Sequence, residues 1–238
     1  MFIIRLLSGP GTFIDKLALI LGFILIGGFS IIIHEWSHGY VALLNGDLTA
    51  KAAGRLSFNP KVHFEVKGLI FLLLIGFGWA KPVPINSMNF RNYKKGMITV
   101  SFAGVTANFL LSSVLALILF LSAKMFYLTS IVNSIQQFFL VFFYTILTVG
   151  IKINLMLVLF NLLPIYPLDG YNIINTIFPR NNFFQQFMIK YGMLILLIII
   201  GLGFLGRTIG VPWLDVFGSF SDLLTDMIDK IVSAGLKI

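Results

Sequence analysis

The sequence has no cysteine and few charged residues. Only 11% of its 238 residues are Asp, Glu, Lys or Arg, against about 25% in a soluble domain. Without cysteine there are no disulfides and no thiolate metal ligands, so any metal site must use histidine and carboxylate groups. With 58% hydrophobic residues and a mean hydropathy of +0.97, the chain is predicted to be a polytopic membrane protein.

Acidic residues are the scarcer kind of charge: 9 against 17 basic residues, for a net charge of +8. A nucleic-acid-binding surface is one explanation of such an excess, but no basic stripe interleaved with aromatic residues is present. Eight of the basic residues fall between Asn45 and Gly96, between apolar segments. This distribution is typical of the positive-inside rule. We therefore expect no nucleic-acid partner and place 45–96 on the cytoplasmic side.

Long apolar runs predict about four transmembrane helices, at 15–44, 97–123, 131–163 and 191–206. The apolar run 68–79 is only about 18 Å long as a helix, so it is predicted to enter the membrane and return. Residues 80–86 contain two prolines and are predicted to be extended, as a wall or gate of a site.

Two further segments complete the predicted fold. Residues 47–67 alternate between polar and apolar and predict short strands or a hairpin at the interface. After Pro212, apolar residues at helical spacing predict an amphipathic helix on the outer surface or against a partner. The expected fold is thus an all-α polytopic membrane protein with a small interfacial β element. We expect one membrane-embedded domain over 1–238, with a core at 15–178 and a C-terminal span and tail at 186–238.

The clearest motif is His34-Glu35-Trp36-Ser37-His38, which follows the uncharged run 17–33. On a helix, residues four apart lie about 40° apart, so both imidazoles are able to hold one metal ion. Glu35 lies to one side, where a general base would take a proton from a zinc-bound water. Such a pattern also arises by chance, but ionisable groups at the end of a span cost about 2.5–3.5 kcal/mol each without a partner.

Asp169 is the natural third ligand. It is the only acidic residue between Glu65 and Asp215. With 45–96 in the cytoplasm, the third span returns to the depth of the histidines, and Pro164 and Pro167 break its helix just before Asp169. Gly170 is expected to let the backbone turn there.

Several motifs follow one another along the chain. They are His34-Glu35-x-x-His38, Gly46-Asp47, Gly54-Arg55-Leu56, Asn59-Pro60, Trp79-Ala80-Lys81-Pro82-Val83-Pro84, Gly104-x-x-x-Asn108 and Asn161-Leu162-Leu163-Pro164 through Leu168-Asp169-Gly170. In these motifs the chain resembles the site-2 protease family of intramembrane zinc metalloproteases, in particular its small prokaryotic branch without an inserted PDZ domain.

The resemblance implies one zinc ion per chain, held by His34, His38 and Asp169, with Glu35 as the general base. It also implies that Asn108 lies near the site, where it would bind the substrate backbone or an oxyanion. From the residues alone, Asn108 is equally consistent with a hydrogen bond between helices.

The predicted function is a zinc-dependent endopeptidase that cleaves a transmembrane protein or peptide near the cytoplasmic face of a prokaryotic cell membrane, with its active site toward the cytoplasm. The alternative is a non-proteolytic zinc-binding protein, either a transporter or an inactive scaffold. A transporter should show paired broken helices, and an inactive scaffold should lack one of the four groups; neither feature is seen. Expected partners are the bilayer and the substrate, while a homo-oligomer or a regulatory membrane partner stays open.

Four other polar residues bear on this interpretation. His63 is predicted to be a loop or interface residue rather than a ligand. Lys152, within the third span, is expected to reach the interface or pair with a neighbour. Asn154 and Asn161 lie seven residues apart on one helical face, which favours packing or lining of the site.

Overall fold

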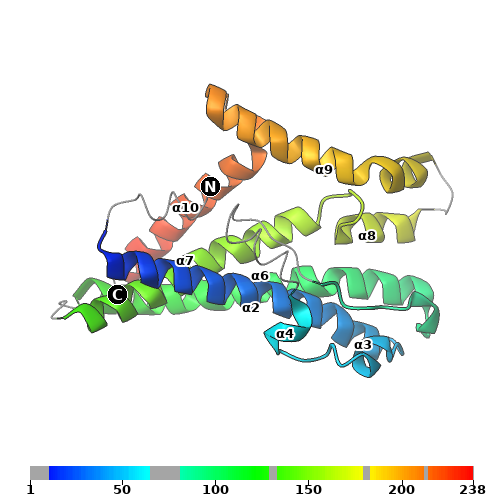
Figure 1. Ribbon diagram of the computed structural model, residues 1–238, viewed down its shortest axis with the longest axis horizontal. Helices are drawn as coiled ribbons and strands as arrows, with labels where there is room; N and C mark the ends of the chain where they lie inside the picture. Colours follow the sequence, from blue (N-terminus) through cyan, green and yellow to red (C-terminus); the bar gives the residue numbers. More distant parts are fainter. Residues whose placement is uncertain (1–10, 65–80, 129–132, 179–182, 212–213, 238) are drawn as a thin grey trace.

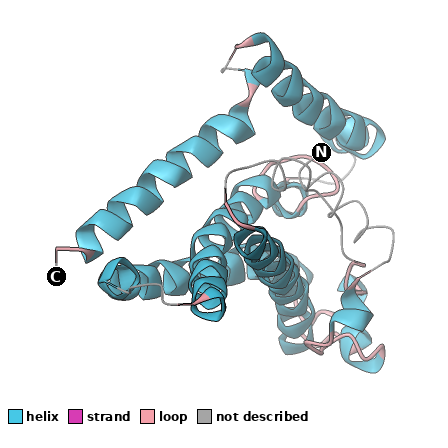
Figure 2. Cartoon of the chain, turned by 60° about the vertical axis from the view of Figure 1, so that its left-hand side comes forward, coloured by secondary structure: helices cyan, strands magenta, loops and turns pink. Residues whose placement is uncertain are grey.

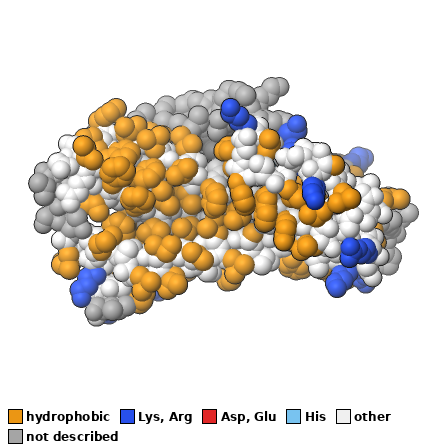
Figure 3. Space-filling view, turned by 90° about the horizontal axis from the view of Figure 1, so that it is seen from below, with side chains coloured by type: hydrophobic (Ala, Val, Ile, Leu, Met, Phe, Trp, Pro, Cys, Tyr) orange, Lys and Arg blue, Asp and Glu red, His pale blue; other side chains and the backbone are white. Residues whose placement is uncertain are grey.

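The computed structural model describes residues 11–64, 81–128, 133–178, 183–211 and 214–237. Four helices in these ranges are long and apolar enough to cross a membrane (Figure 1). They are α2 (Phe13–Leu44), α6 (Tyr93–Leu128), α7 (Ser134–Asn161) and α9 (Phe183–Ile209). The prediction of an all-α, multi-pass membrane protein is confirmed, and α9 starts eight residues earlier than predicted. In Figure 3 hydrophobic side chains cover most of the visible face, while Lys and Arg gather mainly toward its right-hand end.

Helices α2, α6 and α7 pack side by side and form the body of the molecule. Helix α2 begins with a capping box between Thr12 and Asp15 and ends at Asn45, followed by Gly46 at φ +108°. Every fourth residue along one ridge of α2 is buried. Since residues four apart form the ridges by which helices interlock, this ridge carries both motif histidines into the bundle. Its members are Ala18, Gly22, Ile26, Ser30, His34, His38 and Ala42.

Small residues bring the three helices close together. A Cβ added at Gly150 of α7 would lie 2.7 Å from Leu115 Cδ1 and 2.8 Å from Ile26 Cγ1. Both neighbours belong to one buried apolar cluster, whose members are Ile26, Leu115, Leu119, Leu147, Ile151 and Ile228. Glycine at this position therefore lets α7 approach α2 and α6 within side-chain contact, as is common between membrane helices.

The predicted β element is wrong for the described part of 47–67. Residues 47–64 form two short helices joined by turns, α3 (Thr49–Ala52) and α4 (Pro60–His63), and only Phe64 occupies a single bridge position (Figure 2). The cause is local: Asn59 accepts a hydrogen bond from the Lys61 N–H, and Pro60 fixes the first helical residue. Gly54, at φ +65°, follows the end of α3.

The prolines keep the next described segment extended. Residues 81–86 have no regular helix, as predicted, and lead into a short 3₁₀ turn, η1 (Ser87–Asn89). The predicted re-entrant segment 68–79 lies outside the described residues.

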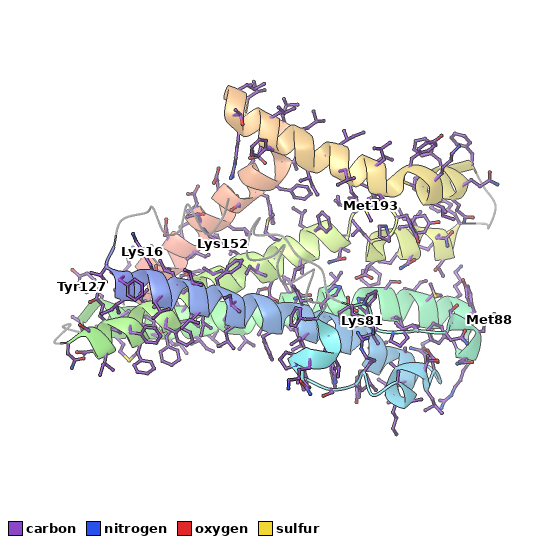
Figure 4. The ribbon with its side chains drawn as sticks, in the orientation of Figure 1. Lys16, Lys81, Met88, Tyr127, Lys152 and Met193 are labelled. Atoms are coloured by element: carbon purple, nitrogen blue, oxygen red, sulfur yellow. The ribbon has the colours of Figure 1, made fainter. Side chains whose placement is uncertain are left out.

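The C-terminal third is built from α8 (Asp169–Ile177), α9 and α10 (Val216–Gly235). Leu196 of α9 packs with Ile165 and Leu168, which hold it beside the start of α8. Helix α10 is the predicted amphipathic helix, but its apolar face covers α6 and α7 of its own chain rather than a membrane surface. The Lys152 amine of α7 donates to Thr225 Oγ1 of α10 at 2.7 Å (Figure 4), so the predicted pairing of Lys152 with a neighbour is confirmed.

Replacing Gly150 with alanine tests the close packing of α7. Overpacking costs about 1–3 kcal/mol, more than the roughly 1 kcal/mol by which helix propensity favours alanine over glycine. We expect the detergent-solubilised Gly150→Ala variant to melt several degrees below the unmodified chain. Gly201→Ala is the matched control, since nothing lies within 4 Å of an added Cβ there. A Gly150→Ala variant as stable as this control would contradict the packing described.

Candidate metal centre

Three ligand atoms from two distant parts of the chain converge inside the bundle. The His34 Nε2 and His38 Nε2 atoms are 3.1 Å apart, and Asp169 Oδ2 lies 3.4 Å from the first and 3.3 Å from the second. Both histidines are buried, and Asp169 is nearly so. In the described part of the chain these residues form a group that is able to hold one metal ion.

The spacing of these atoms fits a tetrahedral ion. Bonds of about 2.0–2.1 Å to zinc at tetrahedral angles separate neighbouring ligand atoms by about 3.3–3.4 Å. The three observed separations are 3.1, 3.3 and 3.4 Å. One tetrahedral position remains for water or substrate, as in catalytic rather than structural zinc sites.

Hydrogen bonds determine which ring nitrogen carries the proton in each histidine. His38 Nδ1 lies 2.7 Å from the Val100 carbonyl oxygen, which only accepts, so His38 Nδ1 must be the donor. His34 Nδ1 lies 2.6 Å from Asn108 Oδ1 and donates to it. In the neutral imidazoles both Nε2 atoms therefore present lone pairs toward Asp169.

Asn108 is oriented by a buried network of side chains from three helices. Its amide nitrogen donates to the Ser30 carbonyl at 3.1 Å and to Asn154 Oδ1 at 2.6 Å. Asn154 in turn donates to Ser30 Oγ and to the Gly150 carbonyl, both at 2.8 Å. Because the two carbonyls only accept, they fix both amides, so Asn108 must turn its oxygen toward His34. Ser30, Asn108 and Asn154 are all fully buried.

The result is a cluster of three acceptors with no donor between them. Asp169 Oδ2 is buried and lacks a hydrogen-bond partner, and the two Nε2 lone pairs face it. Three converging acceptors repel one another unless a cation lies between them. The donor set of two imidazoles and one carboxylate suits zinc.

Glycine in α6 makes room for these imidazoles. A Cβ added at Gly104 would lie 2.5 Å from His34 Cε1 and 2.6 Å from His38 Nε2. Asn108 follows one turn later on the same buried face, and Val100 precedes by one turn. The Gly-x-x-x-Asn motif therefore combines a close approach with a hydrogen bond to one ligand.

Comparison with known proteins agrees with this geometry. The sequence pattern described as "Peptidase family M50" matches residues 22–199, three quarters of the chain. The chain belongs to peptidase family M50. The resemblance to the site-2 protease family is thereby confirmed. The three convergent ligands and Asn108 all fall within the matched part of this M50 protein.

A relative is found among curated proteins. It is the "Putative zinc metalloprotease YwhC" of Bacillus subtilis (strain 168), 40% identical over 152 residues. The match covers 63% of this chain and 66% of that protein, just under two thirds of its length. No solved structure matches the chain. The family is one of peptidases and the name of this relative includes zinc, which agrees with the predicted class of enzyme and the predicted cofactor.

Asp169 reaches the site of this M50 protein from the first residue of α8. Gly170 does not serve a turn, as the sequence suggested, but is the second residue of that helix. Its role is close contact: a Cβ there would collide with the Leu162 and Leu163 carbonyl oxygens at the end of α7. The missing side chain thus lets the start of α8 lie against the turn that follows α7, while α8 packs on α6, and this places Asp169 at the histidines.

The Glu35 carboxylate, unlike the two histidines of the motif, is hydrogen-bonded to a backbone N–H of a distant segment. Its Oε2 accepts a hydrogen bond from the Val83 backbone N–H at 2.9 Å. The segment 81–86, predicted as a wall or gate of the site, therefore does contact the motif.

The other polar residues lie outside the ligand cluster. His63 does not belong to the ligand group, as predicted, but it is a fully buried residue of α4 rather than a loop residue, and its Nε2 donates to the Ser57 carbonyl at 2.6 Å. Asn161 donates to Leu157 of its own helix at 3.0 Å, whereas Asn154 lies in the buried network. The sequence pointed to Asn154 only through its face of α7, and Ser30 showed no signal because serine is common in membrane helices.

Gly104→Ala tests the fit between α6 and the imidazoles. The added methyl group must displace His34 or His38, so we expect bound zinc to fall by about tenfold or more. Metal analysis of the purified chain after zinc repletion and dialysis measures this. Gly201→Ala, which meets no neighbour, should keep its zinc. Full zinc occupancy in Gly104→Ala would show that the site tolerates a wider helix separation.

Proposed function

We propose that the protein is a zinc-dependent endopeptidase that cleaves a membrane-spanning substrate near the cytoplasmic face. One observation carries the proposal: two imidazole lone pairs and one carboxylate oxygen converge within 3.4 Å of each other, and Glu35 immediately follows the first of these ligands. Metal ligands with an adjacent carboxylate, on a helix inside a membrane bundle, are the groups that hydrolysis of a peptide bond requires.

His34, His38 and Asp169 would hold the ion. Bound zinc supplies Lewis acidity, which polarises a carbonyl and lowers the pKa of water. Glu35 acts as the general base: its carboxylate takes a proton from the attacking water and delivers it to the leaving amine. For both transfers the carboxylate must be held within hydrogen-bond reach of the reacting atoms.

Asn108 acts on the reaction through His34. Its side-chain oxygen accepts from His34 Nδ1, and its two amide hydrogens are engaged by Ser30 and Asn154. An amide with this set of partners has no donor to offer an oxyanion. Of the two roles considered for Asn108, the hydrogen bonds support the one between helices, and the bond to His34 orients that residue.

The distribution of charge supports the orientation in the membrane. The motif lies in the last third of α2, and the basic residues between 45 and 96 follow it directly. By the positive-inside rule this end faces the cytoplasm. A helical substrate hides its carbonyl groups in hydrogen bonds, so it must unwind before it reaches Glu35.

Glu35→Gln separates a peptidase from a zinc-binding protein of other function. The substitution keeps the shape of the side chain but removes the base, so cleavage should fall by about 10²-fold or more while zinc content is unchanged. The assay co-expresses the chain with a panel of tagged single-span membrane proteins and identifies fragments by mass spectrometry. Fragments formed equally by the Glu35→Gln variant would contradict the assigned role of Glu35. No fragments from the unmodified chain, across a panel that covers both membrane orientations, would favour a transporter or an inactive scaffold.

Asp169→Ala tests the metal site without a substrate. Removing one of three ligands should reduce bound zinc from about one ion per chain to a small fraction of that. Asp222→Ala, an exposed residue of α10, serves as the control and should retain the metal. An unmodified chain that takes up no zinc after repletion would overturn the proposed mechanism.

A further inference from the structure

The extended segment 81–86 is tied to the rest of the protein at both ends and contacts Glu35 in the middle. It follows the residues 65–80, which the structure does not describe, and precedes η1. Its Val83 side chain is 7% exposed, so the centre of the segment is packed against the protein, while Lys81, Pro82 and Asn86 are exposed. Figure 4 shows Lys81 beside the part of the chain where α2 and α4 meet.

The first end of the segment is held by Arg55 and by the backbone of His63. Arg55, which is 7% exposed, donates through Nη2 to the Lys81 carbonyl oxygen. The Lys81 N–H donates to the His63 carbonyl at 2.7 Å. Both backbone groups of Lys81 are therefore engaged, and one of their partners is a buried cation.

The second end is held by Asp47, directly after the motif helix. Asp47 Oδ2 accepts from the Asn86 N–H at 2.7 Å, and Oδ1 accepts from Asn89 Nδ2 at 2.8 Å. Thr49 donates to the same Oδ1 from its hydroxyl at 2.5 Å and from its backbone N–H at 3.1 Å. Burial acts to raise the pKa of Asp47, but the hydrogen bonds from Thr49, Asn86 and Asn89 outweigh it and hold that pKa below its usual value. The side chain is fully buried and ionised.

Between these ends the segment offers one backbone donor to the motif. Pro82 and Pro84 have no N–H, so the Val83 N–H is the single backbone donor of the three residues, and it is bonded to Glu35 Oε2 at 2.9 Å. The Val83 side chain rests on Gly39, where an added Cβ would lie 2.9 Å from Val83 Cγ1. A glycine one residue after His38 thus sets how closely the segment approaches α2.

We propose that residues 81–86 form a positioning strap whose Val83 N–H orients the Glu35 carboxylate, and that Asp47 and Arg55 are positioning residues that hold the strap. The inference rests on the proposed function of Glu35 as the base. A hydrogen bond from a fixed backbone donor to a carboxylate is charge-assisted and directional. It fixes one oxygen and the plane of the group, so the other oxygen is left in a defined place to receive a proton. Asp47 and Arg55 act on the reaction only through the backbone of the strap.

Val83→Pro is the direct test, because it extends the run of prolines and replaces the N–H that faces Glu35 with a ring carbon. Val83→Ala is the matched control, since it shortens the same side chain and keeps the N–H. With a substrate found in the co-expression assay, we expect Val83→Pro to lower kcat by about 10- to 100-fold with little change in KM. Zinc content should be unchanged in both variants, and Val83→Ala, which keeps the N–H, should lose much less kcat than Val83→Pro.

A second measurement does not depend on activity. The infrared carboxylate band that disappears in Glu35→Gln reports the hydrogen bonding of Glu35. This band should shift clearly further in Val83→Pro than in Val83→Ala, which keeps the N–H. If zinc-loaded Val83→Pro shows an unshifted band and an unchanged kcat, the proposed role of the strap is wrong. If the unmodified chain cleaves no substrate but the band still shifts in Val83→Pro, only the proposed peptidase function is wrong.

Asp47→Asn tests whether Asp47 holds the second end of the strap, and it provides the test of the strap if Val83→Pro fails to fold. An amide retains one acceptor oxygen but turns a donor toward the N–H groups of Asn86 or Thr49, so the second end of the strap is released. We expect the same loss of kcat and the same infrared shift, with zinc retained. Thr49→Val, which removes a partner of Asp47 that does not belong to the strap, is the control and should have a smaller effect. Equal kcat and an unshifted band in folded Asp47→Asn would overturn the role of Asp47.

Discussion

The constraint on which the structure depends is the approach of three acceptor atoms, His34 Nε2, His38 Nε2 and Asp169 Oδ2, with no hydrogen-bond donor between them. Such a cluster is unstable in a medium of low dielectric unless a cation joins it. The rest of the bundle serves this approach. Gly104 lets α6 reach the imidazoles, and Gly170 lets the start of α8 lie against the turn that follows α7. Metal affinity and helix packing are therefore two aspects of one arrangement.

The network around Asn108 shows how polar groups are accommodated inside a membrane bundle. Each donor hydrogen of Asn108 and Asn154 has an acceptor on another residue, and the Ser30 hydroxyl donates to the Ile26 carbonyl at 2.7 Å. A fully satisfied network avoids the penalty of an unpaired polar group in hydrocarbon. It also links α2, α6 and α7 at one depth, which prevents the helices from sliding along one another. The orientation of His34 thus follows from how three spans are assembled.

Much of this arrangement is readable from the sequence, because its signals are long or rare. Four spans follow from hydropathy, and Asp169 follows from the near absence of other acidic residues between Glu65 and Asp215. The strands expected in 47–67 failed because a short alternating pattern is weaker than the local helix signal of Asn59 and Pro60. The contact between Val83 and Glu35 could not be predicted from the sequence. A backbone N–H gives no sequence signal of its own, and only the packing of the chain brings this one to the motif.

The position of α10 has a consequence for the surrounding lipid. Its Ile228 packs in the same cluster as Leu119 of α6 and Ile151 of α7, two membrane-spanning helices, while Asp222, Asp226 and Asp229 are exposed. Placing a carboxylate side chain in the centre of a bilayer costs at least about 2.5 kcal/mol of free energy. The three carboxylates of α10 need lipid headgroups or water beside them. The lipid around α10 must therefore be arranged differently from the lipid around the apolar faces of the other helices.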